Sequence, residues 1–138
     1  MTAPVVTSHT PLRYADPLDT GDVSPELLVL SEPWRLSYGL LDLTVPAGMT
    51  FDGASIPRFF WRVVGPPMRA RYRPAAVAHD AAYKGVLVVQ DGAGRDLGQM
   101  PKATADLMLY DLAVWRGVSR WRAWSMLQAV RWFGKGHW

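Results

Sequence analysis

Short apolar runs separated by turn residues occupy the chain between residues 27 and 51. The runs 27–30, 34–36 and 40–45 are each short and rich in residues that favour β-strands. Glu32-Pro33 and Tyr38-Gly39 interrupt them, and residues 46–48 (Pro-Ala-Gly) supply a further turn. This pattern predicts a small antiparallel sheet in the N-terminal part of the chain.

The N-terminal 25 residues differ in composition from the rest of the chain. Residues 1–25 are rich in Pro, Thr, Ser and Asp, which predicts an irregular N-terminal arm with at most one short strand near residues 12–14. We assign residues 26–138 to a single domain, because 113 residues are enough to bury one hydrophobic core and no second linker is visible.

Helical periodicity begins after residue 55. Ser55 and Pro57 are typical of a helix start, and Gly85, Gly117 and Gly134 are typical of helix ends. A strand over residues 86–89 and the turn residues 91–94 (Asp-Gly-Ala-Gly) interrupt the helices and predict a β-hairpin. The predicted helices cover residues 56–64, 75–84, 101–116 and 120–133. The expected fold is therefore α+β: a small N-terminal antiparallel sheet, then a helical body of three to four helices with an inserted β-hairpin.

Composition narrows the class of protein. The chain has no cysteine, which excludes a disulfide framework and a thiolate metal site. No basic region precedes an apolar run at the N-terminus, so we expect no signal peptide. No run approaches the roughly 20 apolar residues that a membrane-spanning helix needs. Seven Trp in 138 residues indicate an aromatic core or a docking surface.

The charges are unevenly placed along the chain. Residues 1–50 hold six acids against two arginines, whereas residues 101–138 hold six bases against Asp106 and Asp111. A basic, Trp-rich end suits the phosphate of lipid headgroups or of nucleic acid, and the simpler interpretation is a solvated helix face with extended Arg stems. We expect a phospholipid or membrane surface, or other proteins of a particle, as partners rather than nucleic acid.

The chemistry of the chain is concentrated around His79. His79 and Tyr83 share a helix face because they are four residues apart, and Asp80 projects about a third of a turn away. A histidine abstracts a proton from water when a carboxylate holds its other ring nitrogen, and Asp106 is the candidate. The alternative is that His79 and Asp106 form a buried structural pair and Asp80 faces solvent.

The run His-Asp-Ala-Ala-Tyr from His79 to Tyr83, followed by Ala105-Asp106, resembles the His-Asp-x-x-Tyr … Ala-Asp signature of phospholipase A2 enzymes, especially the compact domain of parvovirus capsid proteins. The resemblance implies that His79 is the general base for a water and that Asp80 binds calcium. It also implies that Tyr83 and Asp106 hold the histidine.

Calcium agrees with that chemistry, because a hard cation takes oxygen ligands and polarises an ester carbonyl. Asp52 is a second candidate metal ligand, and Asp52-Gly53 is equally typical of a tight turn. Ser55 is best interpreted as a helix cap. A Ser–His–Asp triad from Ser55, His79 and Asp106 lacks the Gly-x-Ser-x-Gly setting.

A longer stretch, from about Thr50 to the end, resembles a family of phage and prophage proteins, domain of unknown function 1353. Four separated motifs carry this resemblance in order: residues 51–57 (Phe-Asp-Gly-Ala-Ser-Ile-Pro), 75–83 (Ala-Ala-Val-Ala-His-Asp-Ala-Ala-Tyr), 105–106 (Ala-Asp) and 129–134 (Ala-Val-Arg-Trp-Phe-Gly). The resemblance implies a phage or prophage origin and supplies no activity. The protein would then be made in the host cytoplasm, with incorporation into the virion as an option.

The sequence therefore leaves three functional hypotheses. The first is a phage-encoded, calcium-dependent, phospholipase-A2-like hydrolase that uses His79. The second is a non-catalytic virion component of the tail or baseplate, and the third is a hydrolase directed at peptidoglycan or peptide. An enzyme requires His79 and Asp80 to face an open cleft with Asp106 within hydrogen-bond reach, whereas a structural protein would bury all three.

Overall fold

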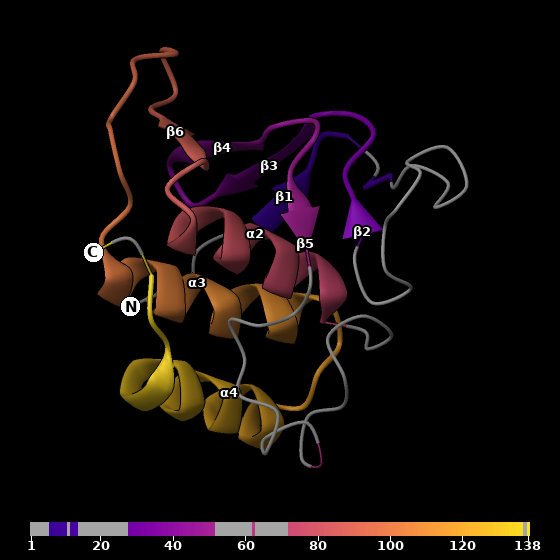
Figure 1. The fold of residues 1–138 in the computed structure, drawn as a ribbon, viewed down its shortest axis with the longest axis vertical. Helices are drawn as coiled ribbons and strands as arrows, with labels where there is room; N and C mark the ends of the chain where they lie inside the picture. Colours follow the sequence, from indigo (N-terminus) through magenta and orange to yellow (C-terminus); the bar gives the residue numbers. More distant parts are fainter. Residues whose placement is uncertain (1–5, 11, 14–27, 52–61, 63–71, 137) are drawn as a thin grey trace.

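The computed structural model describes residues 6–10, 12–13, 28–51, 62, 72–136 and 138. A β-sheet forms one end of the molecule, and three helices are stacked below it in the order α2, α3, α4 (Figure 1). The predicted α+β fold, with an N-terminal antiparallel sheet followed by a helical body, is confirmed.

The main sheet has four antiparallel strands in the order β1-β3-β4-β6. A second, two-stranded sheet pairs β2 with β5. The strands are β1 (Val6–Ser8), β2 (Leu28–Val29), β3 (Trp34–Tyr38), β4 (Leu41–Val45), β5 (Thr50–Phe51) and β6 (Val88–Gln90). The runs at residues 34–36 and 40–45 thus form strands where the sequence predicts them.

One face of the central hairpin is buried, and the alternation of its residues explains why. Trp34, Leu36 and Tyr38 are buried on β3, while Arg35 between them is exposed. The turn to β4 places Gly39 at φ 60°, a backbone conformation that glycine adopts without steric cost. The hairpin can therefore be tight, with Tyr38 opposite the first residue of β4.

The N-terminal arm contributes a strand that the sequence did not indicate. Residues 6–8 form β1 and pair with β3, whereas the strand expected near residues 12–14 is absent at Leu12 and Arg13. Trp34 Nε1 donates a hydrogen bond of 2.9 Å to Ser8 Oγ and ties the two strands together. Residues 6–8 are too polar to show a buried strand pattern, because two of the three are exposed at the sheet edge.

The three described helices are α2 (Arg73–Tyr83), α3 (Lys102–Trp115) and α4 (Arg120–Phe133). Pro74 lies in the first turn of α2, and Gly85 follows its C-terminus at φ 73°. Ser119 is the N-cap of α4, as expected, but its side chain makes no capping hydrogen bond. The helix predicted over residues 56–64 lies outside the described residues, except for Arg62.

The inserted hairpin is minimal. The turn expected at residues 91–94 forms, with Gly94 N donating to Asp91 O at 3.0 Å. The returning arm adds one bridge, between Gln90 and Asp96. The stronger pairing of β6 is with β4, which extends the main sheet.

Helix α2 lies between the sheet and α3, and this position explains its composition (Figure 1). Every residue from 75 to 83 is buried, and five of the nine are alanine. Small side chains allow other elements to approach the helix from several sides. The same helix carries His79, Asp80 and Tyr83, so the fold places the polar cluster inside the core. In the described part of the chain, no helix is both long and apolar enough to cross a bilayer.

Candidate functional site

The site is built where α2 meets α3. His79 Nε2 lies 2.9 Å from Asp106 Oδ1, and the exposed fractions of the two residues are 0% and 1%. Helical periodicity fixes which face of each helix these residues occupy, and the packing of α2 on α3 brings the two faces together. The partner that the sequence proposed for His79 is therefore within hydrogen-bond distance.

Asp106 accepts hydrogen bonds from two further residues. Tyr83 Oη donates to Asp106 Oδ1 at 2.5 Å, and Lys102 Nζ lies 2.8 Å from Asp106 Oδ2. Lys102 Nζ also donates to the backbone oxygen of Val130 on α4, at 3.0 Å. One carboxylate thus links α2, α3 and, through Lys102, α4.

The electrostatics of this cluster favour an ionised aspartate beside a neutral histidine. Burial raises the pKa of Asp106, but hydrogen bonds from His79, Lys102 and Tyr83 outweigh it and hold that pKa below its usual value. Burial lowers the pKa of His79, with Asp106 acting in the opposite direction. Burial, together with Asp106, raises the pKa of Tyr83 well above its usual range, so the phenol stays protonated and donates.

The two ring nitrogens of His79 have different surroundings. Because Asp106 is ionised and accepts, the neutral imidazole carries its proton on Nε2 and leaves the lone pair on Nδ1. Nδ1 is buried and has no hydrogen-bond partner among the described residues. A buried polar atom without a partner costs about 1–3 kcal/mol, so its presence calls for an explanation.

The carboxylate of Asp80 forms a separate ion pair with Lys84. Its Oδ2 lies 3.0 Å from Lys84 Nζ, one helical turn further along α2. Lys84 Nζ also donates to the backbone oxygen of Thr50 at 2.5 Å and lies 3.4 Å from Thr50 Oγ1. An ammonium group is thus surrounded by oxygens from Asp80 and Thr50, and it ties α2 to β5.

The described residues do not by themselves fit a calcium shell. No group of three or more His, Cys, Asp or Glu side chains comes together among them, whereas calcium takes six to eight oxygen ligands. The carboxylate of Asp80 already has the Lys84 ammonium beside it. Asp52, the second predicted metal ligand, and Ser55 lie outside the described residues, so the calcium site stays a prediction.

Aromatic side chains and a glycine pack around the site. The ring of Tyr83 lies 4.1 Å from that of His79, and Trp138 meets Tyr83 edge-on at 5.0 Å. A Cβ at Gly134 would lie 2.5 Å from Tyr83 Oη, so this position after α4 requires glycine. Hydrogen-bond reach to Asp106, one condition for an enzyme, is met. His79, Asp80 and Asp106 are all buried, which is the arrangement expected of a structural protein, and Asp80 does not face solvent.

Sequence reasoning missed two lysines of this site. Lys102 precedes Asp106 by four residues, and Lys84 follows Asp80 by four residues. Oppositely charged residues at this spacing lie on one helix face, so the sequence pattern predicts both ion pairs. What the spacing does not indicate is that each lysine also reaches a backbone oxygen of another element.

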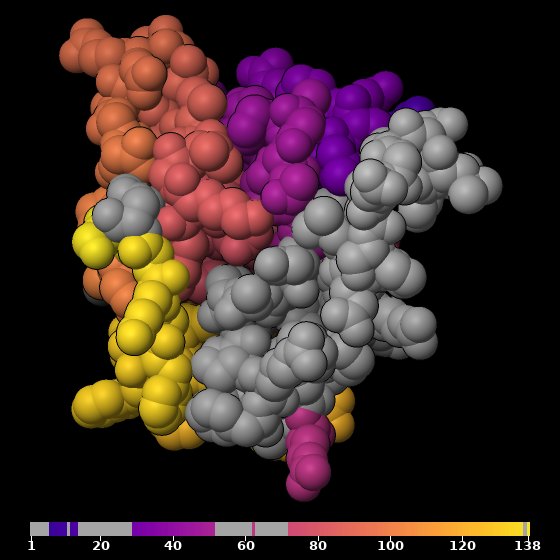
Figure 2. Space-filling model, viewed as in Figure 1, coloured from indigo at the N-terminus to yellow at the C-terminus, as the bar shows by residue number. Residues whose placement is uncertain are grey.

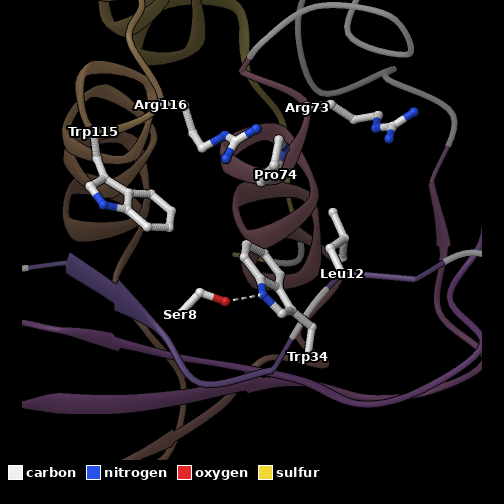
Figure 3. Close-up of a pocket in the computed structure, with 7 residues that line it drawn as sticks. All are labelled: Ser8, Leu12, Trp34, Arg73, Pro74, Trp115 and Arg116. Carbon is white, nitrogen blue, oxygen red and sulfur yellow. Dashed lines mark hydrogen bonds between the residues drawn. The ribbon is translucent and has the colours of Figure 1, made fainter.

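A pocket of about 290 Å³ lies apart from this cluster, at the N-terminal end of α2 (Figure 3). None of the predicted site residues that the structure describes, His79, Asp80, Tyr83 and Asp106, lines it. Its walls come from β1, β3, α2 and the end of α3 (Figure 3). The lining residues are Ser8, Leu12, Trp34, Arg73, Pro74, Trp115 and Arg116.

One family model matches most of the chain. A family model described as protein of unknown function (DUF1353) matches residues 28–130, which include the whole His79–Asp106 cluster and the first eleven residues of α4. The chain belongs to the DUF1353 family. The motifs at residues 75–83 and 105–106, which carry the resemblance noted in the sequence, are thus part of the matched region.

One curated relative has local similarity to the chain. The uncharacterized protein y4jT of Sinorhizobium fredii (strain NBRC 101917 / NGR234) is 50% identical over 36 residues. These residues make up 26% of this chain and 11% of the relative, so the chain spans only a small part of that protein. No solved structure matches the chain.

Proposed function

We propose that this protein is a hydrolase in which His79 activates a water for attack on an ester, in the manner of the phospholipase A2 enzymes that the His79–Tyr83 run resembles. The observation that carries the proposal is the asymmetry of His79. Nε2 is fixed by Asp106, while the buried Nδ1 has no partner among the described residues. A histidine that served only to join helices would be expected to have both nitrogens satisfied.

The proposed reaction uses His79 twice. Nδ1 takes a proton from a water as the water oxygen attacks the carbonyl carbon of the ester, and Asp106 stabilises the imidazolium that forms. The tetrahedral intermediate then breaks its bond to the alcohol oxygen, which receives the proton from Nδ1. The products are a carboxylic acid and an alcohol, and His79 is neutral again.

Tyr83 and Lys102 act as positioning residues in this scheme. Both bind the Asp106 carboxylate, so they hold its orientation toward His79 and favour its ionised state. Because His79 is fully buried, substrate would reach Nδ1 only after part of the surrounding structure moves. Opening of this kind is common in enzymes that exclude water from the reacting atoms.

Calcium belongs to the proposal as a requirement to be tested. If calcium binds, Asp80 and Asp52 are the residues expected to hold it, and it would polarise the ester carbonyl. Lys84 competes for the same carboxylate, because its ammonium lies 3.0 Å from Asp80 Oδ2. Terbium luminescence of the wild type and of Asp80→Asn would report on this site without any need for activity.

The test is release of fatty acid from mixed phospholipid vesicles, with calcium or with chelator. Wild type is compared with His79→Ala and with His9→Ala, a matched change at an exposed histidine on the sheet side of the molecule. The proposal predicts release that falls by about 10²-fold or more in His79→Ala and is unchanged in His9→Ala. Release by neither the wild type nor the control, from folded protein, would contradict it.

A second candidate is a non-catalytic component of a phage particle. The burial of His79, Asp80 and Asp106 favours a structural role for the cluster. In that case the cluster joins three helices and Nδ1 has no chemical role. His79→Ala would then lower stability without altering any hydrolysis, and the protein would be found in purified particles. Thermal melting of the same variants, measured beside the vesicle assay, separates the two candidates.

A further inference from the structure

Helix α4 has two faces of opposite character. Its inner face, formed by Ala123, Met126 and Val130, is fully buried and packs on α3. The outer face presents Trp121, Trp124 and Trp132, which are 60%, 58% and 78% exposed. Separations of three and eleven residues are close to one and three helical turns, so the three indoles project from the same side.

Exposed aromatic side chains occur late in the described sequence, and three of them, Trp121, Trp124 and Trp132, lie together on the outer face of α4, whereas Trp115 lines the pocket beside β1 and β3. Among the described residues, the large apolar side chains exposed elsewhere are aliphatic and scattered, such as Leu40 and Leu97. Every exposed aromatic one lies at or after Trp115: Trp115, Trp121, Trp124, Trp132, Phe133 and Trp138. Single exposed apolar residues are ordinary, but a gathered aromatic group marks a contact surface.

The charge of the same segment has one sign. Between Leu112 and the end of the chain there is no acidic residue, while five bases occur. They are Arg116, Arg120, Arg122, Arg131 and Lys135. The guanidinium carbon of Arg122 lies 5.3 Å from the ring centroid of Trp121, so cation and indole are adjacent on the surface.

We infer that the outer face of α4 is a docking surface for an anionic phospholipid bilayer. Indole rings favour the boundary between headgroups and acyl chains, because the ring is apolar and its N–H remains hydrated. Arginines beside them meet lipid phosphate, and each basic residue near an anionic surface adds attraction. The absence of acids from residue 112 onward removes the repulsion that such a surface would otherwise meet.

The position and shape of α4 suit a flat surface. The helix is the outermost layer, at the end of the molecule opposite the sheet (Figure 1), and yellow atoms of the C-terminal segment are exposed on the face shown in Figure 2. A single convex helix can lie in the plane of an interface. Single-stranded nucleic acid is instead bound in basic grooves where bases stack, so lipid fits this face better.

Binding of purified protein to sedimented vesicles tests the inference, with vesicles of phosphatidylcholine alone and of phosphatidylcholine mixed with phosphatidylglycerol. One variant combines Trp121→Ala, Trp124→Ala and Trp132→Ala, and a second combines Arg120→Gln, Arg122→Gln and Arg131→Gln. The matched controls are Leu40→Ala with Leu97→Ala, and Arg35→Gln with Arg95→Gln, all exposed positions away from α4. Circular dichroism confirms that each variant is folded.

We expect the wild type and both controls to bind anionic vesicles, and each α4 variant to lose at least about tenfold in partition. Binding should weaken with added salt and on phosphatidylcholine alone. Wild type that stays in the supernatant would overturn the inference, as would α4 variants that bind like the controls. Trp-dependent self-association without vesicle binding would also overturn it and assign the face to a second copy of the chain.

This surface does not depend on the proposed hydrolysis. Vesicle binding without fatty acid release would support the docking surface and count against the enzyme. Release without binding through α4 would do the reverse.

Discussion

One carboxylate oxygen of Asp106 on α3, Oδ1, accepts hydrogen bonds from both His79 Nε2, at 2.9 Å, and the Tyr83 hydroxyl, at 2.5 Å. Lys102 Nζ donates a hydrogen bond to the other carboxylate oxygen and a second one to the backbone oxygen of Val130 on α4. A single buried side chain therefore links three helices, directly or through Lys102. Removing the charge of Asp106 should therefore weaken the packing of all three helices.

Asp106→Asn is expected to lower the free energy of unfolding by about 3 kcal/mol. The change leaves the side chain nearly the same size but removes the charge that compensates Lys102 and orients His79, and breaking a buried pair is costly. Urea denaturation measures the effect. Lys102→Met should cost only about 1 kcal/mol, because the Lys102 side chain is 32% exposed and partly screened by solvent. Equal losses in the two variants would contradict this ranking.

Gly134→Ala should destabilise the protein by about 1–3 kcal/mol through Tyr83. The new Cβ would lie 2.5 Å from Tyr83 Oη and from the Val130 carbonyl oxygen, so the phenol must leave Asp106 or the backbone must shift. Tyr83→Phe removes the hydroxyl, and the cost of Gly134→Ala should therefore shrink in that background. A double-mutant cycle by thermal melting measures this coupling.

The control for that cycle is Gly92→Ala in the turn after β6, where a Cβ meets no atom within 4 Å. It should leave stability within about 0.5 kcal/mol of the wild type. Additive effects of Gly134→Ala and Tyr83→Phe would show that the contact with Tyr83 does not restrict position 134.

The stability of the protein should fall as the pH drops below about 6.5. Burial lowers the pKa of His79 from its usual 6.5, so in this window the unfolded chain binds a proton that the folded chain does not. The stabilisation is complete above pH 6.5 and is lost as the pH falls toward the lowered pKa, at up to about 1.4 kcal/mol per pH unit.

His79→Gln should flatten this part of the curve, as measured by urea denaturation between pH 7 and 5. Asp106, whose pKa is also lowered, acts in a separate and more acidic window, below its usual value of 3.8. Identical slopes for the wild type and His79→Gln between pH 7 and 5 would contradict the buried, neutral state of His79.

Tyr38→Phe should cost about 1 kcal/mol, because the hydroxyl of Tyr38 donates to Asp111 Oδ2 and joins β3 to α3. Burial and Asp111 raise the pKa of Tyr38 well above its usual range, so it remains a donor at all ordinary pH values. Asp111→Asn keeps an acceptor and should cost less. Chemical denaturation of both variants gives the order, and a larger loss for Asp111→Asn would refute it.

Local sequence signals were sufficient for the three described helices and for part of the site. Pro74, Gly85, Gly117 and Gly134 mark helix boundaries through backbone restrictions that act within a few residues. The spacing of His79 and Tyr83 puts them on one face for the same reason. The resemblance to phospholipase A2 supported Asp106 as the partner of His79, and the packing of α3 on α2 brings it there.

Local sequence signals could not predict three features: the pairing of β1 with β3, the pairing of β6 with β4, and the burial of the site. Residues 6–8 lack a buried strand pattern, and β6 follows a helix that separates it from β4 by more than 40 residues in sequence. The periodicity that places His79 on a helix face does not say which surface will cover it. Local geometry is encoded residue by residue, whereas pairing and burial depend on which distant surfaces meet when the core is packed. The sequence therefore determined the helices and the chemical groups of this protein, and only the tertiary structure decided that His79 and Asp106 would be enclosed and that the tryptophans of α4 would face outward.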